Sequence, residues 1–200
     1  MRRTGERYTT AHAELLGAST AVRPLPQDTE RPSMSQPSPR VADLFRRFDN
    51  AARDIIIKSE NFARRDGSAT VDPRHILLGV AGVEGLGSQA LRVHGHVQPL
   101  IDASVIDDAA FAEQPHVPYS TASKKLLEQV LIEAIAETSN VISTQHVLAA
   151  LMDAGGDEVR STLEQLDVDM EALRLALPAP DPADRAAALE HVKTWVPPTA

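Results

Sequence analysis

The sequence predicts an all-α protein in which two pseudo-symmetric four-helix repeats form one bundle of eight helices. The first observation is an internal duplication, because VDPRHILL at residues 71–78 returns as ISTQHVLA at residues 142–149. The second is the spacing of apolar residues, which recur every three or four positions, as along one face of a helix. The third is that Gly and Pro separate these stretches, where helices end and begin.

The duplication extends well beyond these eight residues. Sliding the chain by 71 residues superimposes residues 49–80 on a second copy without a gap. Two expected helix starts coincide, since Asp49 falls on Ser120 and Asp72 falls on Ser143. All four are favourable N-cap residues, whose side-chain oxygens accept from free backbone N–H groups.

The composition describes a globular chain with an aliphatic core and narrows the functional classes. The 200 residues carry a net charge of −8, which argues against a nucleic-acid binder that relies on phosphate contacts. There is no cysteine, so disulfides and thiolate chemistry are excluded. We find neither a secretory leader nor the ~18 consecutive apolar residues of a membrane span, and we expect a cytoplasmic protein without a membrane partner.

Proline and polar residues delimit the folded part of the chain. The N-terminal residues 1–40 are mildly basic and rich in Pro, Ser and Thr, so we expect them to form a disordered tail. The predicted domain spans residues 41–177. Within it, the first repeat covers residues 44–106 and the second covers residues 119–177. A Pro-rich C-terminal tail follows at residues 178–200.

In the first repeat, a long helix with one apolar stripe is predicted to end at Asp66-Gly67. Asp72-Pro73 then combines an N-cap residue with proline at the first helical position. The four helices expected here span Asn50–Arg65, Pro73–Val83, Ser88–Val93 and Val97–Ile106.

In the second repeat the same order of elements returns, and Leu148 takes the place of Leu77. Each unit is too small to bury its own apolar face, so we expect both to share one core with these leucines inside. Glu128 and Glu133 are interpreted as solvated charges on the long helix. The helices expected here span Thr121–Glu137, Thr144–Asp153, Glu158–Leu166 and Met170–Leu177, and Asp184–Lys193 in the tail is compatible with a short additional helix.

Four segments of the chain resemble those of a known protein family. They are LFRRFDNAARDIII (44–57), DPRHILLGV (72–80), PHVPYSTASKKLLEQ (115–129) and STQHVLAAL (143–151). From Leu44 to Leu177 the chain resembles the Clp N-terminal (Clp repeat) domain of the ClpA and ClpC unfoldases, and most of all the ClpC type. The resemblance implies a pseudo-symmetric eight-helix bundle that recruits substrates and adaptors for an ATP-driven unfoldase.

The chain lacks the phosphate loop of a nucleotide-hydrolysing domain, since GVEGLGS at residues 82–88 has no lysine. We therefore expect a free-standing Clp N domain that is not an enzyme and needs no cofactor. His75 and His146 are interpreted as structural histidines bonded to backbone rather than as metal ligands, because the duplication already explains the pair.

The resemblance also implies a binding surface near the start of each long helix. In the family, residues at these positions lie near a surface used by adaptors and, in actinobacterial ClpC, by cyclic-peptide antibiotics. Exposed aromatic side chains beside charged ones would form an anchor for a peptide. The alternative is that the aromatic rings fill the core. The candidate residues are Phe45, Phe48, Tyr119, Lys124 and Glu128.

A second set of residues concerns phosphoarginine, which some ClpC N domains bind through a glutamate before each histidine. Here Arg74 and Gln145 stand at those two positions, so both carboxylates are missing. A charge-assisted hydrogen bond is roughly twice as strong as a neutral one, so we predict weak or absent recognition of this tag. Any remnant of the site would involve Ser143, Thr144 and Gln145.

These observations favour a binding module that acts as an adaptor, decoy or regulator in Clp-dependent proteolysis. Its expected partners are Clp unfoldase or protease components, adaptors, client peptides and cyclic-peptide antibiotics, and not nucleic acid. The alternative is a regulatory protein whose basic N-terminal tail and Trp195 segment bind a partner unrelated to Clp proteolysis.

Overall fold

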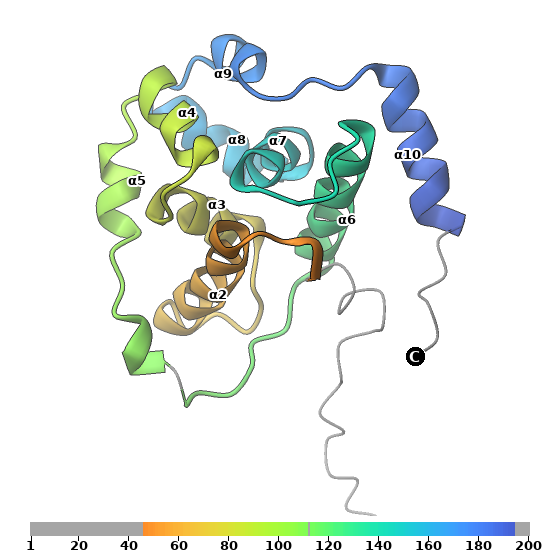
Figure 1. The fold of residues 1–200 in the computed structure, drawn as a ribbon. Helices are drawn as coiled ribbons and strands as arrows, with labels where there is room; N and C mark the ends of the chain where they lie inside the picture. The colour runs from red at the N-terminus through yellow and green to blue at the C-terminus, as the bar shows by residue number, and fades with distance from the viewer. Residues whose placement is uncertain (1–45, 112, 195–200) are drawn as a thin grey trace, which may run out of the picture. The chain divides into compact units, whose positions relative to one another are not determined.

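The chain folds into a succession of helices, seen in a computed structural model that describes residues 46–111 and 113–194 (Figure 1). The first repeat contains α2 (Asn50–Arg65), α3 (Pro73–Gly82), α4 (Leu86–His94) and α5 (Gln98–Ala103). The second contains α6 (Thr121–Ala136), α7 (Thr144–Ala154), α8 (Gly156–Gln165) and α9 (Met170–Ala176). A 3-10 helix, η1 (Asp108–Phe111), lies between the repeats, and α10 (Pro182–Thr194) follows them.

The predicted fold class and both repeats are confirmed, and the described residues contain no β-strand. The predicted N-terminal tail, Phe45 and Trp195 lie outside the described residues. The long helices begin at the predicted caps. Asp49 Oδ1 accepts from the Ala52 amide at 2.7 Å, and Ser120 Oγ accepts from the Ser123 amide at 3.2 Å.

Short helices differ from the prediction at their ends, since α4 begins at Leu86 rather than Ser88, α8 begins at Gly156 rather than Glu158, and α5 ends at Ala103 rather than Ile106. The glycines that separate the apolar stretches lie at the N-caps or in the first turns of α4 and α8. At Gly87 a Cβ atom would lie 2.6 Å from the Thr144 carbonyl oxygen, so glycine allows α4 to approach α7 closely.

The two repeats are joined by a pair of reciprocal β-bridges. Phe48, just before α2, pairs with Ile142, just before α7, and Tyr119, just before α6, pairs with Val71, just before α3. Each bridge has two backbone hydrogen bonds between 2.7 and 3.1 Å. Since these residues are equivalent under the duplication, the bridges relate the repeats by pseudo-twofold symmetry.

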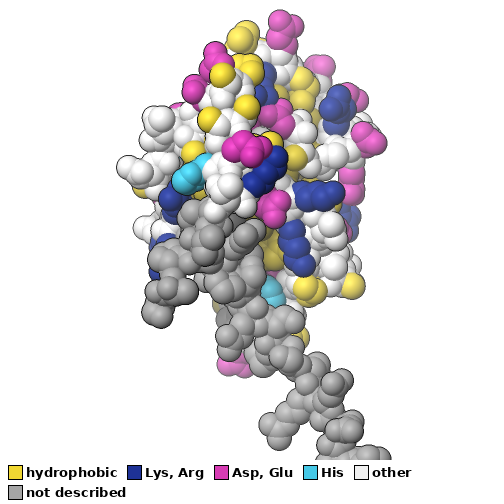
Figure 2. Space-filling model, turned by 90° about the vertical axis from the view of Figure 1, so that its right-hand side faces the viewer, with side chains coloured by type: hydrophobic (Ala, Val, Ile, Leu, Met, Phe, Trp, Pro, Cys, Tyr) yellow, Lys and Arg dark blue, Asp and Glu magenta, His cyan; other side chains and the backbone are white. Residues whose placement is uncertain are grey.

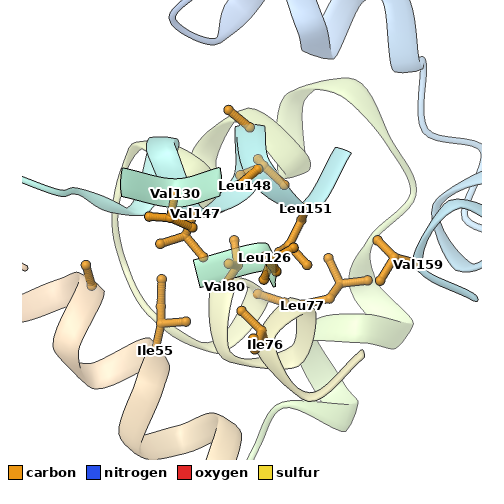
Figure 3. Packing of buried hydrophobic residues seen from close by; sticks show 14 of the residues in the cluster. Ile55, Ile76, Leu77, Val80, Leu126, Val130, Val147, Leu148, Leu151 and Val159 are labelled. Atoms are coloured by element: carbon orange, nitrogen blue, oxygen red, sulfur yellow. The ribbon is translucent and has the colours of Figure 1, made fainter. Parts of the chain in front are cut away.

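The core lies between the repeats and belongs to both. α4 of the first repeat packs on α7 of the second, and α8 of the second packs on α3 of the first. Leu77 and Leu148 are 1% and 0% exposed in the same hydrophobic cluster (Figure 3). The shared core is therefore confirmed, and so is the register of the duplication.

Helix α10 is longer than predicted and packs on α6. Its Ala188 is buried against Ile132 and Ala136, and this small cluster is separate from the main core. The interpretation of Glu133 as a solvated charge is wrong, because this residue is 1% exposed beneath α10. Glu128, by contrast, is exposed as predicted.

None of the described helices is by itself long and apolar enough to cross a membrane. Taken together, α3 and α4 meet the same length and composition criteria, but the chain bends by 92° between them.

Candidate peptide-binding site

The start of α6 presents an aromatic ring that is anchored to the first repeat. Tyr119 is half-buried, and its hydroxyl donates to the Ile56 carbonyl oxygen at 3.4 Å. Its ring centroid lies 6.4 Å from that of His116. Burial, with the charge of Glu60 added, raises the pKa of the Tyr119 phenol, so the group stays neutral. The ring is therefore fixed in position at the edge of the core.

Lys124 and Glu128 follow on α6 and are both exposed. They stand four residues apart, so their side chains are neighbours on one helix face. Tyr119, Lys124 and Glu128 are called the α6 N-terminal patch below. The patch combines an anchored aromatic ring with one positive and one negative side chain.

Phe48 takes a different place from its equivalent Tyr119. The ring is 2% exposed and belongs to the main core, which fits the alternative that this aromatic residue fills the core. Phe45, the other aromatic candidate, lies outside the described residues.

The segment that leads into Tyr119 is held by two residues that sequence reasoning missed. Glu60 Oε1 accepts from the Val117 amide and contacts His116 Nδ1, each at 3.0 Å. Glu60 also pairs with Arg64, whose Nε donates to the Pro115 carbonyl oxygen at 3.1 Å. Opposite charges four residues apart on α2 were the available signal, but this signal does not reveal which segment they bind.

Both repeated histidines have structural roles, as predicted. His75 Nδ1 accepts from the Asp72 amide and His146 Nδ1 accepts from the Ser143 amide, both at 2.9 Å. Each histidine thereby takes the place of the Glu or Gln in a capping box at the start of its helix. Among residues 46–111 and 113–194, no three His, Asp or Glu side chains converge in a way that could hold a metal ion.

Arg74 lies among acidic and hydroxyl groups at the start of α3. Its Nη2 donates to Ser68 Oγ at 3.3 Å, and its guanidinium lies 3.8 Å from carboxylate oxygens of Asp66 and Glu158. The guanidinium is thus partly neutralised within the protein.

The equivalent positions in the second repeat are used for packing. Ser143 caps α7, with its Oγ 3.1 Å from His146 Nδ1. Thr144 is buried, and its Oγ1 accepts from the Gly87 amide at 3.0 Å, which fixes the start of α4. Gln145 is half-buried beside them. Weak binding of phosphoarginine stays a prediction that calorimetry with the free amino acid would test.

Comparisons with known proteins agree with this architecture. The model of the family described as Clp repeat (R) N-terminal domain matches residues 47–166. An ATP-dependent Clp protease ATP-binding subunit ClpA homolog from Cyanidium caldarium is 32% identical over 138 residues, which are 66% of this chain and 16% of that protein. An uncharacterized protein of Mycobacterium tuberculosis is 32% identical over 111 residues, covering 54% of this chain and 44% of its own length.

Among solved structures, the N-terminal domain of the Clp-associated chaperone ClpD from Arabidopsis thaliana aligns with a TM-score of 0.50 at 23% identity. The alignment covers 66% of this chain and 95% of that one, and it supports the fold. The family match covers more than half of the chain. The chain spans only a small part of the first relative's length, and the family match shows that it belongs to the Clp repeat (R) N-terminal domain family.

Proposed function

We propose that the protein recruits peptides and adaptor proteins of Clp-dependent proteolysis through the α6 N-terminal patch. The observation that carries this proposal is the half-buried, anchored Tyr119 ring just before α6, whose following turns expose Lys124 and Glu128. Membership in the Clp repeat N-terminal domain family supports it. Recruitment rather than catalysis is the activity that we assign.

The chemistry of the patch suits an apolar or cyclic peptide. The Tyr119 hydroxyl is already bonded to backbone, so the half-buried ring can contact a ligand at little cost in side-chain entropy. Lys124 and Glu128 can pair with a carboxylate and an amine of the bound peptide. A cyclic peptide loses little freedom on binding, which favours such ligands on a small surface.

The proposal is tested by titrating labelled unfolded casein or a labelled cyclic peptide against the full chain. Truncation of an anchor residue costs about 1–2 kcal/mol or more, so Tyr119→Ala should weaken binding about tenfold or more. Tyr119→Phe keeps the ring and should bind like the wild type. Lys124→Ala should weaken binding, whereas Arg160→Ala, on the exposed side of α8, is the matched control.

Two results would contradict the proposal. One is unchanged binding by Tyr119→Ala with its helical circular dichroism intact. The other is a pull-down with the full chain that enriches neither a Clp component nor an unfolded client. Deletion of residues 1–40 separates the proposal from the alternative based on the tails, because binding through the patch should survive it.

A further inference from the structure

Residues 115–118, which lead into Tyr119, belong to neither a helix nor a strand, so their backbone groups need partners from other elements. Arg64 Nε and Nη2 donate to the Pro115 carbonyl oxygen at 3.1 and 3.0 Å. Glu60 Oε1 accepts from the Val117 amide at 3.0 Å. Both side chains come from α2 and form an ion pair with each other. Two charged residues of the first repeat therefore hold the segment that carries the Tyr119 ring.

Both side chains are mostly buried, although the segment that they hold lies at the surface. The Glu60 and Arg64 side chains are 16% and 11% exposed, whereas Pro115 and His116 are exposed residues. Burying two charges costs free energy unless the pair is well placed and its remaining hydrogen bonds are satisfied. Here the bonds to backbone satisfy them, and such charge-assisted bonds are roughly twice as strong as neutral ones. The segment is therefore held in a defined position.

The fold of the repeat does not require this ion pair. Under the duplication, Glu60 and Arg64 correspond to Leu131 and Ile135 of α6. Leu131 packs against the main core, and Ile135 packs in the small cluster beneath α10. The same helix positions thus serve apolar packing in one repeat, and in the other they hold an irregular segment that ends at Tyr119.

We infer, on the basis of the proposed function, that Glu60 and Arg64 are positioning residues of the recruitment site. Ile56, Glu60 and Arg64 are spaced four residues apart and form one row along α2. The Ile56 carbonyl oxygen accepts from the Tyr119 hydroxyl, while the other two residues fix the backbone that leads to this ring. A peptide that binds a ring already in place loses no affinity to the ordering of this segment.

The test is a double-mutant cycle in the full chain, with labelled unfolded casein as the probe. Glu60→Ala should weaken binding roughly three- to tenfold, because the segment must then be ordered on binding. In the Tyr119→Ala background the same substitution should have no further effect, since the ring that it positions is absent. Glu60→Gln keeps an acceptor for the Val117 amide and should restore most of the binding.

Lys58→Ala is the matched control. Lys58 also belongs to α2, but its side chain bonds to Asp108 of η1, ahead of the segment that leads into Tyr119. Its removal should leave the affinity for casein unchanged. If Glu60→Ala lowers the helical content, Arg64→Ala serves as the second variant, because it releases the Pro115 carbonyl oxygen and keeps the bond from Val117 to Glu60.

Hydrogen exchange of the Val117 amide, measured by NMR, separates this positioning role from the proposed function. If Tyr119→Ala binds casein like the wild type, the proposed function fails, and faster exchange in Glu60→Ala still shows that Glu60 holds the segment. Unchanged exchange and unchanged binding in Glu60→Ala would overturn the positioning role. So would Glu60→Gln binding as weakly as Glu60→Ala, or an equal cost of Glu60→Ala with and without the Tyr119 ring.

Discussion

The outer faces of the two long helices differ, although both are covered by the segment that follows their repeat. On α2 the contact is polar, since Lys58 and Asn61 each donate to Asp108 of η1 at 2.9 Å. Partial burial acts to raise the pKa of Asp108, but these hydrogen bonds lower it. On α6 the equivalent positions are Gln129 and Ile132, and the contact with α10 is apolar around one buried ion pair. The two repeats therefore share their core and their helix caps. Their outer faces differ, because η1 packs on α2 and α10 packs on α6.

The histidines give a second contrast between the repeats. His146 Nε2 bonds to Glu137, whereas the equivalent pair, His75 Nε2 and Asp66 Oδ2, is 3.6 Å apart. The aspartate is one methylene shorter, and His75 Nε2 is buried without a hydrogen-bond partner. One side-chain length therefore decides whether this buried nitrogen is satisfied.

The largest expected effect tests whether the cores of the repeats are equivalent. Leu77→Ala and Leu148→Ala should each lower the free energy of unfolding by roughly 2–5 kcal/mol, because both remove a fully buried side chain. Urea unfolding followed by circular dichroism measures both values. A cost near zero for either leucine would show that the shared core does not depend on both repeats.

A somewhat smaller effect should separate the two covered faces. Arg185→Ala leaves the carboxylate of Glu133 buried without its cation, and we expect a loss of roughly 2–3 kcal/mol. Lys58→Ala removes the matching pair of α2, but the Asp108 side chain is 43% exposed, so the loss should stay below about 1 kcal/mol.

Combining Arg185→Ala with Glu133→Gln is the control for this contrast. The neutral side chain needs no cation, so the double variant should be more stable than Arg185→Ala alone. If Arg185→Ala and Lys58→Ala lower the free energy of unfolding equally in the same urea titration, both α10 and η1 are held by ordinary surface ion pairs.

Most of the fold could be predicted because its signals are local or repeated. The caps at Asp49 and Ser120 and the register of Leu77 on Leu148 depend on neighbouring residues and on the duplication. Glu133 could not be placed, because its partner Arg185 is 52 residues away in a helix outside the repeats.

The candidate site was harder to predict than the fold. Tyr119 and Phe48 occupy equivalent positions, and periodicity does not distinguish a half-buried ring from a buried one. Glu60 and Arg64 were missed because hydrogen bonds to backbone leave no trace in the apolar pattern. Exposure of Lys124 and Glu128 followed from their place on the polar side of the helix.

A smaller effect is expected where the long helices end. Gly67 and Thr138 are equivalent and both have positive φ, +64° and +57°. Threonine is strained in this region, so Thr138→Gly should stabilise the protein by roughly 0.5–1 kcal/mol. Gly67→Ala should destabilise it by about 1 kcal/mol, through backbone strain alone, since a Cβ there would meet no atom within 4 Å. Thermal unfolding with no gain for Thr138→Gly would contradict the argument.

The smallest effect concerns the response of His75 to pH. Burial, together with the nearby Arg74, lowers the pKa of His75 below that of the unfolded chain, although Asp66, Asp72 and Glu158 act in the opposite direction. As the pH falls below about 6.5, His75 therefore binds a proton in the unfolded state before it does so in the folded state, and the free energy of unfolding decreases.

Exchanging the two carboxylates between the repeats isolates this effect. Asp66→Glu should give His75 Nε2 the bond that Glu137 gives His146, raise the pKa of His75, and reduce the loss of stability between pH 7.5 and 5.5. Glu137→Asp is the reciprocal variant and should remove the satisfied bond of His146. Urea titrations at both pH values measure the differences. If Asp66→Glu is as sensitive to acid as the wild type, the missing methylene does not explain the acid sensitivity, and burial together with the Arg74 charge controls the pKa of His75.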